Sequence, residues 1–569
     1  MSKQPKDDIE RKPIKNFREL VKRYEQFKDK TAFKYKKDGE IKEITYSEYA
    51  EDIKSMSEAI IASDTKRVAV IGDNRYEWCV TYLGVECAGK VIVPLDKALT
   101  NVEIEKLLKR SEVDLVVYEE KYTEAIENAI KDGLNIKYKI CMDNKKDESV
   151  VQFKDFIESG RKILKSNKAK YNKVTINNTE MYIMLFTSGT TSEPKAVMLS
   201  QNNICSNISA ISKHVKLYKT DTLLSFLPIH HTFECTITFL YGTYSGATIA
   251  FCEGLRHIAD NLKEFKVSVF VAVPLVLETM YKKIQKGIAD SGKEKLINTM
   301  KKVSEVLLKC HIDARKVLFK PVLKQFDEYL RVVLYGAAPM NKETIEGYNA
   351  LGIELVQGYG LTETSPVIAA ETDERKRPGS VGLPLCNLEV KIADKDKDGI
   401  GEIMAKGPSI MLGYYENKEA TKKVLKKGWF CTGDYGYIDK DGFLYVTGRK
   451  SDVIVLRNGK NIYPQELEFL INKINYVEES LIYAREKNVT DTLICAKVVY
   501  NKDLITKELG EKTEEEYKEE IWKQIKEINK ELPTYKHIKE ITVTEEPLDK
   551  TTTHKVKRYQ EINKMEKAK

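Results

Sequence analysis

The sequence predicts an α/β fold, with a large multi-layer N-terminal domain of β-sheets flanked by helices and a small α+β C-terminal domain. Its 569 residues are too many for one hydrophobic core, so at least two domains are expected. Apolar runs of strand character alternate with helical periodicity, which is typical of parallel sheets covered by helices. The pattern changes after Gly442, and we place the boundary at Lys450, giving domains 1–449 and 450–569.

The first elements show this alternation directly. The apolar side chains of residues 16–24 share one helical face, which predicts packing against a core, with membrane contact as the alternative. Residues 67–74 read as a buried strand ending in a turn, residues 76–89 as a helix ended by a glycine, and residues 90–96 as the next strand.

Later segments are more charged. Residues 282–330 show a long helical pattern, and residues 443–456 are strand-like. A charged helix follows over residues 514–532, where Ile521, Ile525 and Ile528 form its apolar stripe.

Composition narrows the class of protein. The net charge of +8 rests on 94 Lys and Arg against 86 Asp and Glu, a mixed surface that permits attraction to anionic ligands or acidic lipid. No nucleic-acid recognition motif stands out, so no nucleic-acid partner is expected. The ten cysteines have no CxxC spacing and are expected to be reduced, buried thiols. Without a signal peptide or an apolar run of membrane-spanning length, we expect a cytoplasmic protein with at most peripheral membrane contact.

The stretch FTSGTTSEPKAVMLS at residues 186–200 is the most informative. An apolar strand-like run feeds a loop of small hydroxyl residues with one glycine and one lysine, a composition suited to holding phosphate. A polar surface loop is the alternative for this stretch alone. A P-loop is excluded because Pro194 stands where that motif needs a glycine before Lys195.

Further motifs follow in a fixed order. They are LPIHHTFE (227–234), YGAAPM (335–340), QGYGLTETSP (357–366), TGD (432–434), GRKSDVIVLRNGKNIYPQELE (448–468) and KTTTHKVKR (550–558). In this order and spacing the chain resembles the adenylate-forming superfamily of acyl-CoA synthetases, adenylation domains and luciferases, from about residue 32 to residue 558.

The resemblance implies a two-step reaction with ATP, Mg²⁺ and coenzyme A, and a mobile C-terminal domain that swings between the steps. A carboxylate first attacks the α-phosphate of ATP, and a thiol then attacks the acyl-adenylate. Such chemistry depends on positioning and charge stabilisation. It also implies that the β- and γ-phosphates are held by Thr187, Ser188, Gly189, Thr190, Thr191 and Lys195. Ser192 and Ala196 stand where the family has glycine, so loop movement could be slower.

The middle motifs match the nucleotide site of the family. They imply nucleotide contacts from Gly336, Ala337, Ala338, Gln357, Gly358, Tyr359 and Gly360. By the same resemblance Tyr359 stacks on adenine, Thr362 contacts phosphate, and Glu363 with Thr187 binds Mg²⁺. The alternative for this segment is a turn between strand and helix with a capping threonine.

The later motifs imply the remaining roles. Asp434 matches the acid that accepts hydrogen bonds from both ribose hydroxyls, and Arg449 approaches the same ribose. Lys555 matches the ammonium that bridges the carboxylate and the α-phosphate, although His554 replaces the usual glycine before it. Gly459 matches the loop that lines the pantetheine tunnel.

Two further residues complete the expected machinery. Ser451 occupies the hinge position, which is Asp or Lys in most of the family, with Asp452 next to it. His231 matches a residue at the base of the acyl pocket, whereas His230 is expected to be structural; a satisfied core histidine is the alternative for His231 as well.

The class of carboxylic acid substrate is supported by one segment only, whereas the adenylation chemistry is supported by several motifs. The segment 315–339 resembles the form found in long-chain fatty acid members, so we expect a fatty acyl-CoA synthetase. Activation of an aryl or other carboxylic acid, loading of a carrier protein in trans, and luciferase-type oxygenation stay open. A non-catalytic scaffold would require lesions at Lys555, Glu363 or Asp434, and all three are intact.

Overall fold

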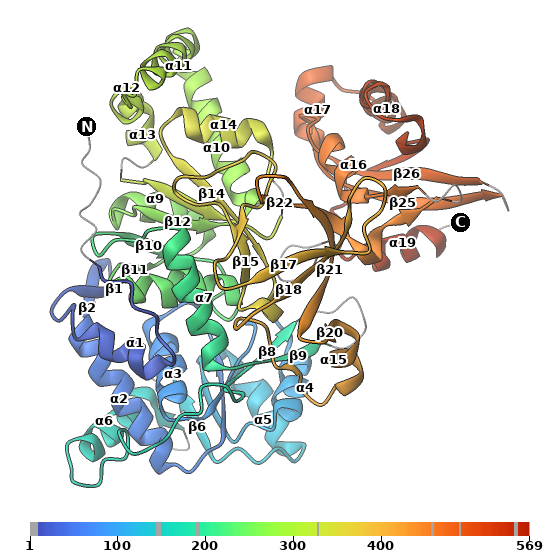
Figure 1. The fold of residues 1–569 in the computed structure, drawn as a ribbon. Coiled ribbons are helices and arrows are strands. Elements are labelled where there is room, and N and C mark those ends of the chain that lie inside the picture. Colours follow the sequence, from blue (N-terminus) through green and yellow to red (C-terminus); the bar gives the residue numbers. More distant parts are fainter. Residues whose placement is uncertain are drawn as a thin grey trace. The chain divides into compact units, whose positions relative to one another are not determined.

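The computed structural model describes most of the chain and divides it into two compact units (Figure 1). The first unit consists of residues 1–187, 194–390 and 405–430, and the second of residues 391–404 and 431–569, together with 188–193. The described residues are 9–143, 150–187, 194–326, 329–338, 340–456, 460–488, 491–550 and 556–567.

The first unit contains an eight-stranded sheet in the order β19-β9-β8-β4-β3-β5-β6-β7. The strands β3 to β7 pair in parallel, as the alternation in the sequence predicts, while β8 and β9 form an antiparallel pair. The strand bounds are β3 (Arg67–Ile71), β4 (Val91–Pro94), β5 (Leu115–Tyr118), β6 (Tyr138–Cys141), β7 (Val151–Gln152), β8 (Ile183–Thr187), β9 (Lys195–Leu199) and β19 (Gly413–Tyr414). Helices near this sheet are α3 (Tyr76–Cys87), α4 (Asn101–Ser111), α5 (Thr123–Lys131) and α6 (Phe153–Leu164).

A nine-stranded sheet of the same unit runs in the order β16-β15-β14-β13-β12-β10-β11-β1-β2. Its central strands β11, β10, β12, β13 and β14 are parallel. The bounds are β1 (Thr31–Lys37), β2 (Glu40–Thr45), β10 (Thr222–Ser225), β11 (Thr248–Phe251), β12 (Val269–Ala272), β13 (Val332–Tyr335), β14 (Glu354–Gly360), β15 (Val367–Ala370) and β16 (Leu383–Pro384). Its helices include α7 (Gln201–His214), α9 (Ile258–Glu264), α10 (Pro274–Asp290), α11 (Glu294–Lys309), α12 (Arg315–Leu318), α13 (Lys320–Phe326) and α14 (Lys342–Ala350).

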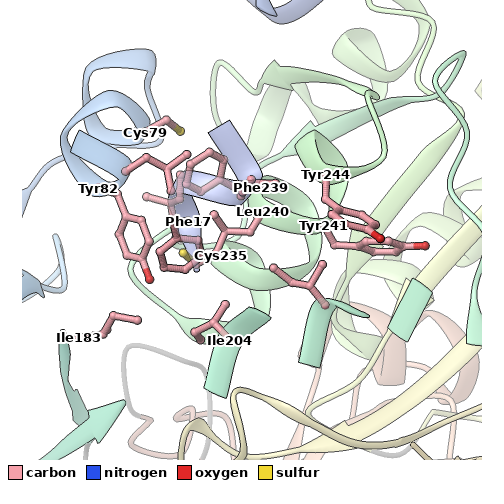
Figure 2. Close-up of a cluster of buried hydrophobic side chains, with 14 of the residues drawn as sticks. Phe17, Cys79, Tyr82, Ile183, Ile204, Cys235, Phe239, Leu240, Tyr241 and Tyr244 are labelled. Carbon is pink, nitrogen blue, oxygen red and sulfur yellow. The ribbon is translucent and has the colours of Figure 1, made fainter. Parts of the chain in front are cut away.

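The main core of the first unit gathers aromatic side chains from distant segments. Helix α1 (Phe17–Tyr24) begins at Asn16, whose side chain accepts a hydrogen bond from the Glu19 N–H. Phe17 and Tyr24 are fully buried, and Figure 2 shows Phe17 beside Tyr82, Cys235 and Phe239. Each such buried side chain contributes roughly 1.5–3 kcal/mol. The predicted packing role of this helix is therefore confirmed, and membrane contact through its apolar face is wrong.

The second unit is built on the three-stranded sheet β25-β26-β27, with α16 and α18 against it. Helix α18 begins with a capping box at Thr513 and buries Ile521 and Ile525 of its predicted stripe, whereas Ile528 is half-buried. The elements of the second unit are β22 (Leu444–Arg449), β23 (Ile454–Val455), β24 (Asn461–Ile462), α16 (Pro464–Ile471), β25 (Val477–Asn488), β26 (Asp491–Tyr500), α17 (Lys502–Leu509), α18 (Glu514–Lys530), β27 (Glu540–Thr544) and α19 (Arg558–Lys567). The strands β17 (Glu389–Ala393), β18 (Gly401–Lys406) and β21 (Trp429–Ile438) belong to it in part.

The predicted fold class is confirmed, with two local corrections. The strand-like run 443–456 is two strands, β22 and β23, separated by a 3₁₀ turn at Lys450–Asp452. All ten cysteines lie within the described residues and are in the thiol form, without disulfides, but Cys310 and Cys386 are exposed, so the expectation that all are buried is wrong. Within the described residues, no helix has both the length and the apolar character needed to cross a membrane.

Candidate active site

The predicted phosphate loop lies between β8 and β9. Thr187 ends β8 and is paired in register with Lys195, which begins β9, and the Thr187 hydroxyl lies 3.4 Å from the Lys195 carbonyl oxygen. Ser188, Gly189, Thr190, Thr191 and Ser192 lie outside the described residues. Ala196 is fully buried inside β9, opposite Phe186. A residue in a regular strand needs no glycine conformation, so this departure from the family pattern leaves the strand intact.

One tyrosine joins this hairpin to the candidate metal ligand. The Lys195 ammonium lies 5.1 Å from the ring centroid of Tyr414, a cation–π distance. The Tyr414 hydroxyl donates a hydrogen bond of 2.9 Å to Oε1 of Glu363. The pairing of β19 with β9 places Tyr414 beside Val197 and so fixes this geometry. The structure thus brings together two predicted phosphate and metal residues, separated by 168 positions, through a residue that sequence reasoning missed.

The Glu363 backbone is fixed as well. The Met411 N–H donates a hydrogen bond of 2.9 Å to the Glu363 carbonyl oxygen. Thr362 to Thr364 form a single 3₁₀ turn, in which the hydroxyl of Thr364 accepts from the Leu361 N–H. This turn joins β14 to β15, so the alternative of a turn between a strand and a helix is wrong. Among the described residues, no group of three or more His, Cys, Asp or Glu side chains is placed to hold a metal ion. Mg²⁺ bound by one carboxylate and substrate phosphates needs no such cluster.

The two predicted nucleotide motifs lie side by side at the carboxyl ends of β13 and β14. Tyr335 is in register with Gln357 and donates a hydrogen bond of 2.9 Å to its side-chain oxygen. A Cβ atom at Gly336 would lie 2.8 Å from the Gly358 carbonyl oxygen, so only glycine allows the two segments this close. This edge of parallel strands is where α/β sheets bind ligands.

Sharp backbone turns surround this edge. Ala337 has φ of 73°, a left-handed conformation that costs a non-glycine residue roughly 1–3 kcal/mol. A Cβ atom at Gly360 would lie 1.9 Å from the Pro366 carbonyl oxygen. Tyr359 lies between Gly358 and Gly360 and packs partly buried against the main core. Ala338 follows Ala337 in the same turn, and Pro339 lies outside the described residues.

In the second unit, the predicted ribose residues meet in one hairpin. Asp434 of β21 is paired in register with Arg449 of β22, and Arg449 Nε lies 3.0 Å from Asp434 Oδ1. The Asp434 N–H donates to the Thr432 hydroxyl, which in turn donates to the Ile403 carbonyl oxygen over 2.8 Å. The Asp434 side chain is only 7% exposed. The arrangement holds a carboxylate with acceptor capacity suited to a vicinal diol.

The expected hinge lies directly after this hairpin. Lys450 pairs with Glu402 over 2.7 Å, and this hydrogen bond raises the pKa of the lysine. The Ser451 hydroxyl donates to Oδ1 of Asp452, and Gln465 Nε2 donates to Oδ2 over 2.7 Å. Asp452 is therefore bound to the elements that follow it, while Ser451 is exposed.

The flanks of the predicted catalytic loop are ordered by several contacts. Lys550 and Val556 form an antiparallel bridge, and the Lys550 ammonium pairs with Glu479 over 2.6 Å. Arg558 binds Glu468 over 2.6 Å and reaches Asp452 over 3.6 Å. Lys555 and His554, together with Gly459 of the predicted pantetheine loop, lie outside the described residues.

The predicted acyl-pocket histidine sits in a tight turn of the first unit. Its Nδ1 lies 3.3 Å from the Phe233 N–H, which fits a neutral ring accepting a hydrogen bond. His230 Nε2 lies 3.6 Å from Asp96 Oδ2, and burial lowers the pKa of this histidine despite that carboxylate. His231 is half-buried and takes part in this local backbone contact, so both its acyl role and the core-histidine alternative stay predictions.

A buried carboxyl group follows that turn, and sequence reasoning missed its role. Glu234 accepts hydrogen bonds from Ser225 over 2.6 Å and from Thr238 over 2.9 Å, and burial raises its pKa to about 8. Asn74 donates to both the Ser225 hydroxyl and the Leu227 carbonyl oxygen. Glu234 opens a π-helix over Glu234–Tyr241, a geometry often found near functional sites. The network fixes the turn that carries both histidines.

Comparison with known proteins identifies the family. A profile described as AMP-binding enzyme matches residues 20–415, and one described as AMP-binding enzyme C-terminal domain matches residues 451–568. The chain belongs to the AMP-binding enzyme family. The recognition of an adenylate-forming enzyme from its ordered motifs is therefore confirmed.

Relatives of the AMP-binding chain include ligases of both acceptor types. It is 27% identical over 525 residues to the long-chain-fatty-acid–[acyl-carrier-protein] ligase AEE15 of Arabidopsis thaliana, covering 79% of this chain and 72% of that protein. It is 27% identical over 514 residues to the human long-chain-fatty-acid–CoA ligase ACSBG2, covering 85% and 76%. The O-succinylbenzoate coenzyme A synthetase of Bacillus subtilis, solved with AMP, shares the fold at 22% identity with a TM-score of 0.72, covering 96% and 98%.

Proposed function

We propose that this AMP-binding enzyme is a fatty acid–CoA ligase, which converts a fatty acid, ATP and coenzyme A into acyl-CoA, AMP and pyrophosphate. The observation that carries the chemistry is the Lys195–Tyr414–Glu363 assembly beside the β8–β9 hairpin. It places an ammonium and a carboxylate next to the loop composition suited to triphosphate. The fatty acid class is supported by the segment 315–339 and by the names of the relatives.

In the first step, a carboxylate oxygen of the fatty acid attacks the α-phosphorus of ATP. The bond from that phosphorus to the β-phosphate bridging oxygen breaks, and pyrophosphate leaves with the electron pair. Thr187 and Lys195, with the loop between them, hold the β- and γ-phosphates, while Lys555 neutralises charge at the α-phosphate. Glu363 and Thr187 would hold Mg²⁺, which shields the phosphate charge when bound. Their oxygen donors fit a hard cation.

In the second step, the thiolate of coenzyme A attacks the acyl carbon. The bond from that carbon to the AMP oxygen breaks, giving the thioester and AMP. Asp434 and Arg449 keep the nucleotide ribose in place through both steps. Rotation at Ser451 replaces Lys555 by Gly459 at the reaction centre between the two steps. The segment that rotates is a C-terminal domain of residues 450–569.

A second candidate function is acyl transfer to a carrier protein in trans, favoured by the acyl-carrier-protein ligase among the relatives. Both acceptors present the same phosphopantetheine thiol. We propose a cytoplasmic location for either reaction.

The deciding experiment measures AMP release from acetate, octanoate, palmitate and benzoate, each with coenzyme A or with a phosphopantetheinylated carrier protein. Each buried methylene should add roughly 0.8 kcal/mol of binding, so affinity should climb with chain length until the pocket is full. A preference for acetate or benzoate would overturn the fatty acid proposal and leave the adenylation chemistry standing. Turnover with the carrier protein alone would select the second candidate.

A further inference from the structure

The positive charge of this protein is concentrated in one helical region of the first unit. Residues 281–320 contain ten lysines and one arginine against four acidic residues, a net charge of +7, while the whole chain carries +8. The other parts of the sequence are therefore almost neutral. These forty residues form the end of α10, then α11, α12 and the start of α13, which lie together in Figure 1. A charge this concentrated points to an anionic partner.

Helix α11 presents three distinct stripes. Ile297 and Ser304 point inward and are buried, and Ile297 belongs to the core under this region. One residue earlier on the wheel, Leu296 and Val303 are exposed, at 55% and 46%. Val306 continues this second stripe at 61% exposed. The apolar stripe is thus rotated about 100° from the face that packs on the protein, since each residue turns the helix by that angle.

The third stripe is basic. Lys295, Lys302 and Lys309 are spaced seven residues apart and are all exposed. Each of the first two directly precedes an apolar residue of the second stripe, so the ammonium groups flank that stripe along its length. Glu305 and Glu294 fall on the side of the helix beyond the lysines. We call the apolar and basic stripes together the α11 face.

The segment after the helix extends the same surface. Ile312 is 49% exposed and Val317 is 72% exposed, whereas Asp313 is neutralised by Arg315 over 2.7 Å. Monomeric proteins rarely gather so many exposed aliphatic side chains without a partner.

We infer that the α11 face docks on the surface of an anionic lipid bilayer. An apolar stripe flanked by lysines is the arrangement of helices that lie in the membrane interface, where aliphatic side chains enter the acyl boundary and ammonium groups meet phosphate headgroups. A folded acidic protein would satisfy the lysines and would require a matching apolar groove for five aliphatic residues. The bilayer provides both surfaces at once and needs no such match.

Docking at a membrane would bring the enzyme close to a fatty acid substrate, an advantage that rests on the proposed function. Long-chain fatty acids partition into bilayers, so an enzyme held at the surface meets its substrate at high local concentration. The docking itself is measured without turnover, and its failure is therefore distinguishable from failure of the ligase proposal.

The test is co-sedimentation of the full chain with vesicles of phosphatidylcholine and phosphatidylglycerol in equal parts, and with pure phosphatidylcholine. Binding should be strong only to the anionic vesicles and should fall with added salt. The variant K295Q/K302Q/K309Q should bind about a hundredfold more weakly, from roughly fivefold for each lysine near the surface. The variant L296S/V303S/V306S should also lose binding, at least about tenfold, because the inserted apolar area is removed.

Matched controls carry the same changes elsewhere on the surface. K507Q/K523Q/K526Q removes three exposed lysines of α17 and α18, and V102S/L255S/L504S removes three exposed aliphatic groups. Both should bind vesicles as the unaltered protein does, and all four should keep its thermal midpoint. Equal binding to both vesicle types, or anionic binding unchanged in the α11 variants, would overturn the inference. Binding of an acidic carrier protein to the α11 face without vesicle binding would overturn it too.

Discussion

The two units assemble their parts of the candidate site in different ways. In the first unit, Lys195, Glu363 and Tyr414 come from three distant segments and meet because β19 pairs with β9. In the second unit, Asp434 and Arg449 belong to one hairpin and face each other in register. The first arrangement depends on the folding of the whole unit, and the second on a single turn of chain. We therefore expect the first to be rigid and sensitive, and the second to tolerate motion of the elements around it.

The largest effect should come from Lys555→Ala, which tests the proposed role of Lys555 in adenylate formation. Adenylate formation should fall on the order of 10²–10³, because one preorganised charge contact with the transition state is lost. Thioester formation from a preformed acyl-adenylate should change far less. Single-turnover assays of each half-reaction measure both. Equal losses in the two steps would show that Lys555 has another role.

A loss confined to the opposite step is expected from Ser451→Pro. Proline fixes φ near −65° and removes a backbone donor, so rotation at this position should stop. Adenylate formation should survive while thioester formation collapses, as measured by the same pair of assays. We place the rotation at Ser451 because it matches the hinge position of the family, and Asp452 beside it is bound to Gln465. Normal thioester formation in this variant would move the hinge elsewhere.

A smaller effect is expected from Tyr414→Phe, which breaks the long-range assembly of the first unit at one atom. Loss of a hydrogen bond to a charged group costs about 1.5–3 kcal/mol, so kcat/KM should fall roughly tenfold to a hundredfold. Glu363→Gln should weaken the use of Mg²⁺·ATP, with partial recovery at higher Mg²⁺. If Tyr414 acts through Glu363, the double variant should be less impaired than the sum of both changes predicts.

The matched control for this cycle is Tyr415→Phe. The Tyr415 hydroxyl accepts a hydrogen bond from Arg67 over 2.9 Å and has no described contact with Glu363. Its kcat/KM should match that of the unaltered enzyme. Strict additivity in the cycle would separate Tyr414 from the metal site.

A change in stability, with no expected effect on the chemical steps, concerns the buried network of the first unit. The pKa of Glu234 is raised to about 8 from 4.5, so its stability contribution is full below pH 4.5 and is lost as the pH rises toward 8. In the unaltered protein the free energy of unfolding should fall by up to about 1.4 kcal/mol per pH unit in that window, and Glu234→Gln should abolish this fall. Urea unfolding across the window measures the slope. An unchanged slope would mean that Glu234 is ionised in the folded protein.

Sequence reasoning predicts local features of this fold well and long-range ones poorly. Strand β3 and helix α3 follow from short periodic runs, and the burial of α1 follows from its single apolar face. The break at Lys450–Asp452 escaped prediction because apolar runs suited to strands, residues 443–446 and 453–456, lie on both sides of it. The pattern of residues within one segment does not predict which other strand that segment pairs with.

The same limit applies to the candidate site. Asp434 and Arg449 could be placed together from motif resemblance, and the structure brings them within 3.0 Å. Tyr414 was missed because its partner Glu363 lies 51 positions earlier, with no periodic signal joining them. Glu234 stood inside a recognised motif, but its hydrogen bond comes from Ser225 at the end of β10, which in turn accepts from Asn74 in the segment after β3. Contacts made by tertiary packing leave no trace in local spacing.

Arg558 gives the second unit a mechanical property. It binds Glu468 in α16, the Ile482 carbonyl oxygen in β25 and, more distantly, Asp452 beside the hinge. Arg558, three residues after Lys555, is thereby bound to Asp452 and Glu468, which follow Ser451 in the sequence. A rotation of the backbone at Ser451 would therefore move these two segments together, as one rigid body. Under the proposed mechanism, one rotation would then bring Lys555 into use for the first half-reaction and Gly459 into use for the second, so the two residues could not act at the same time.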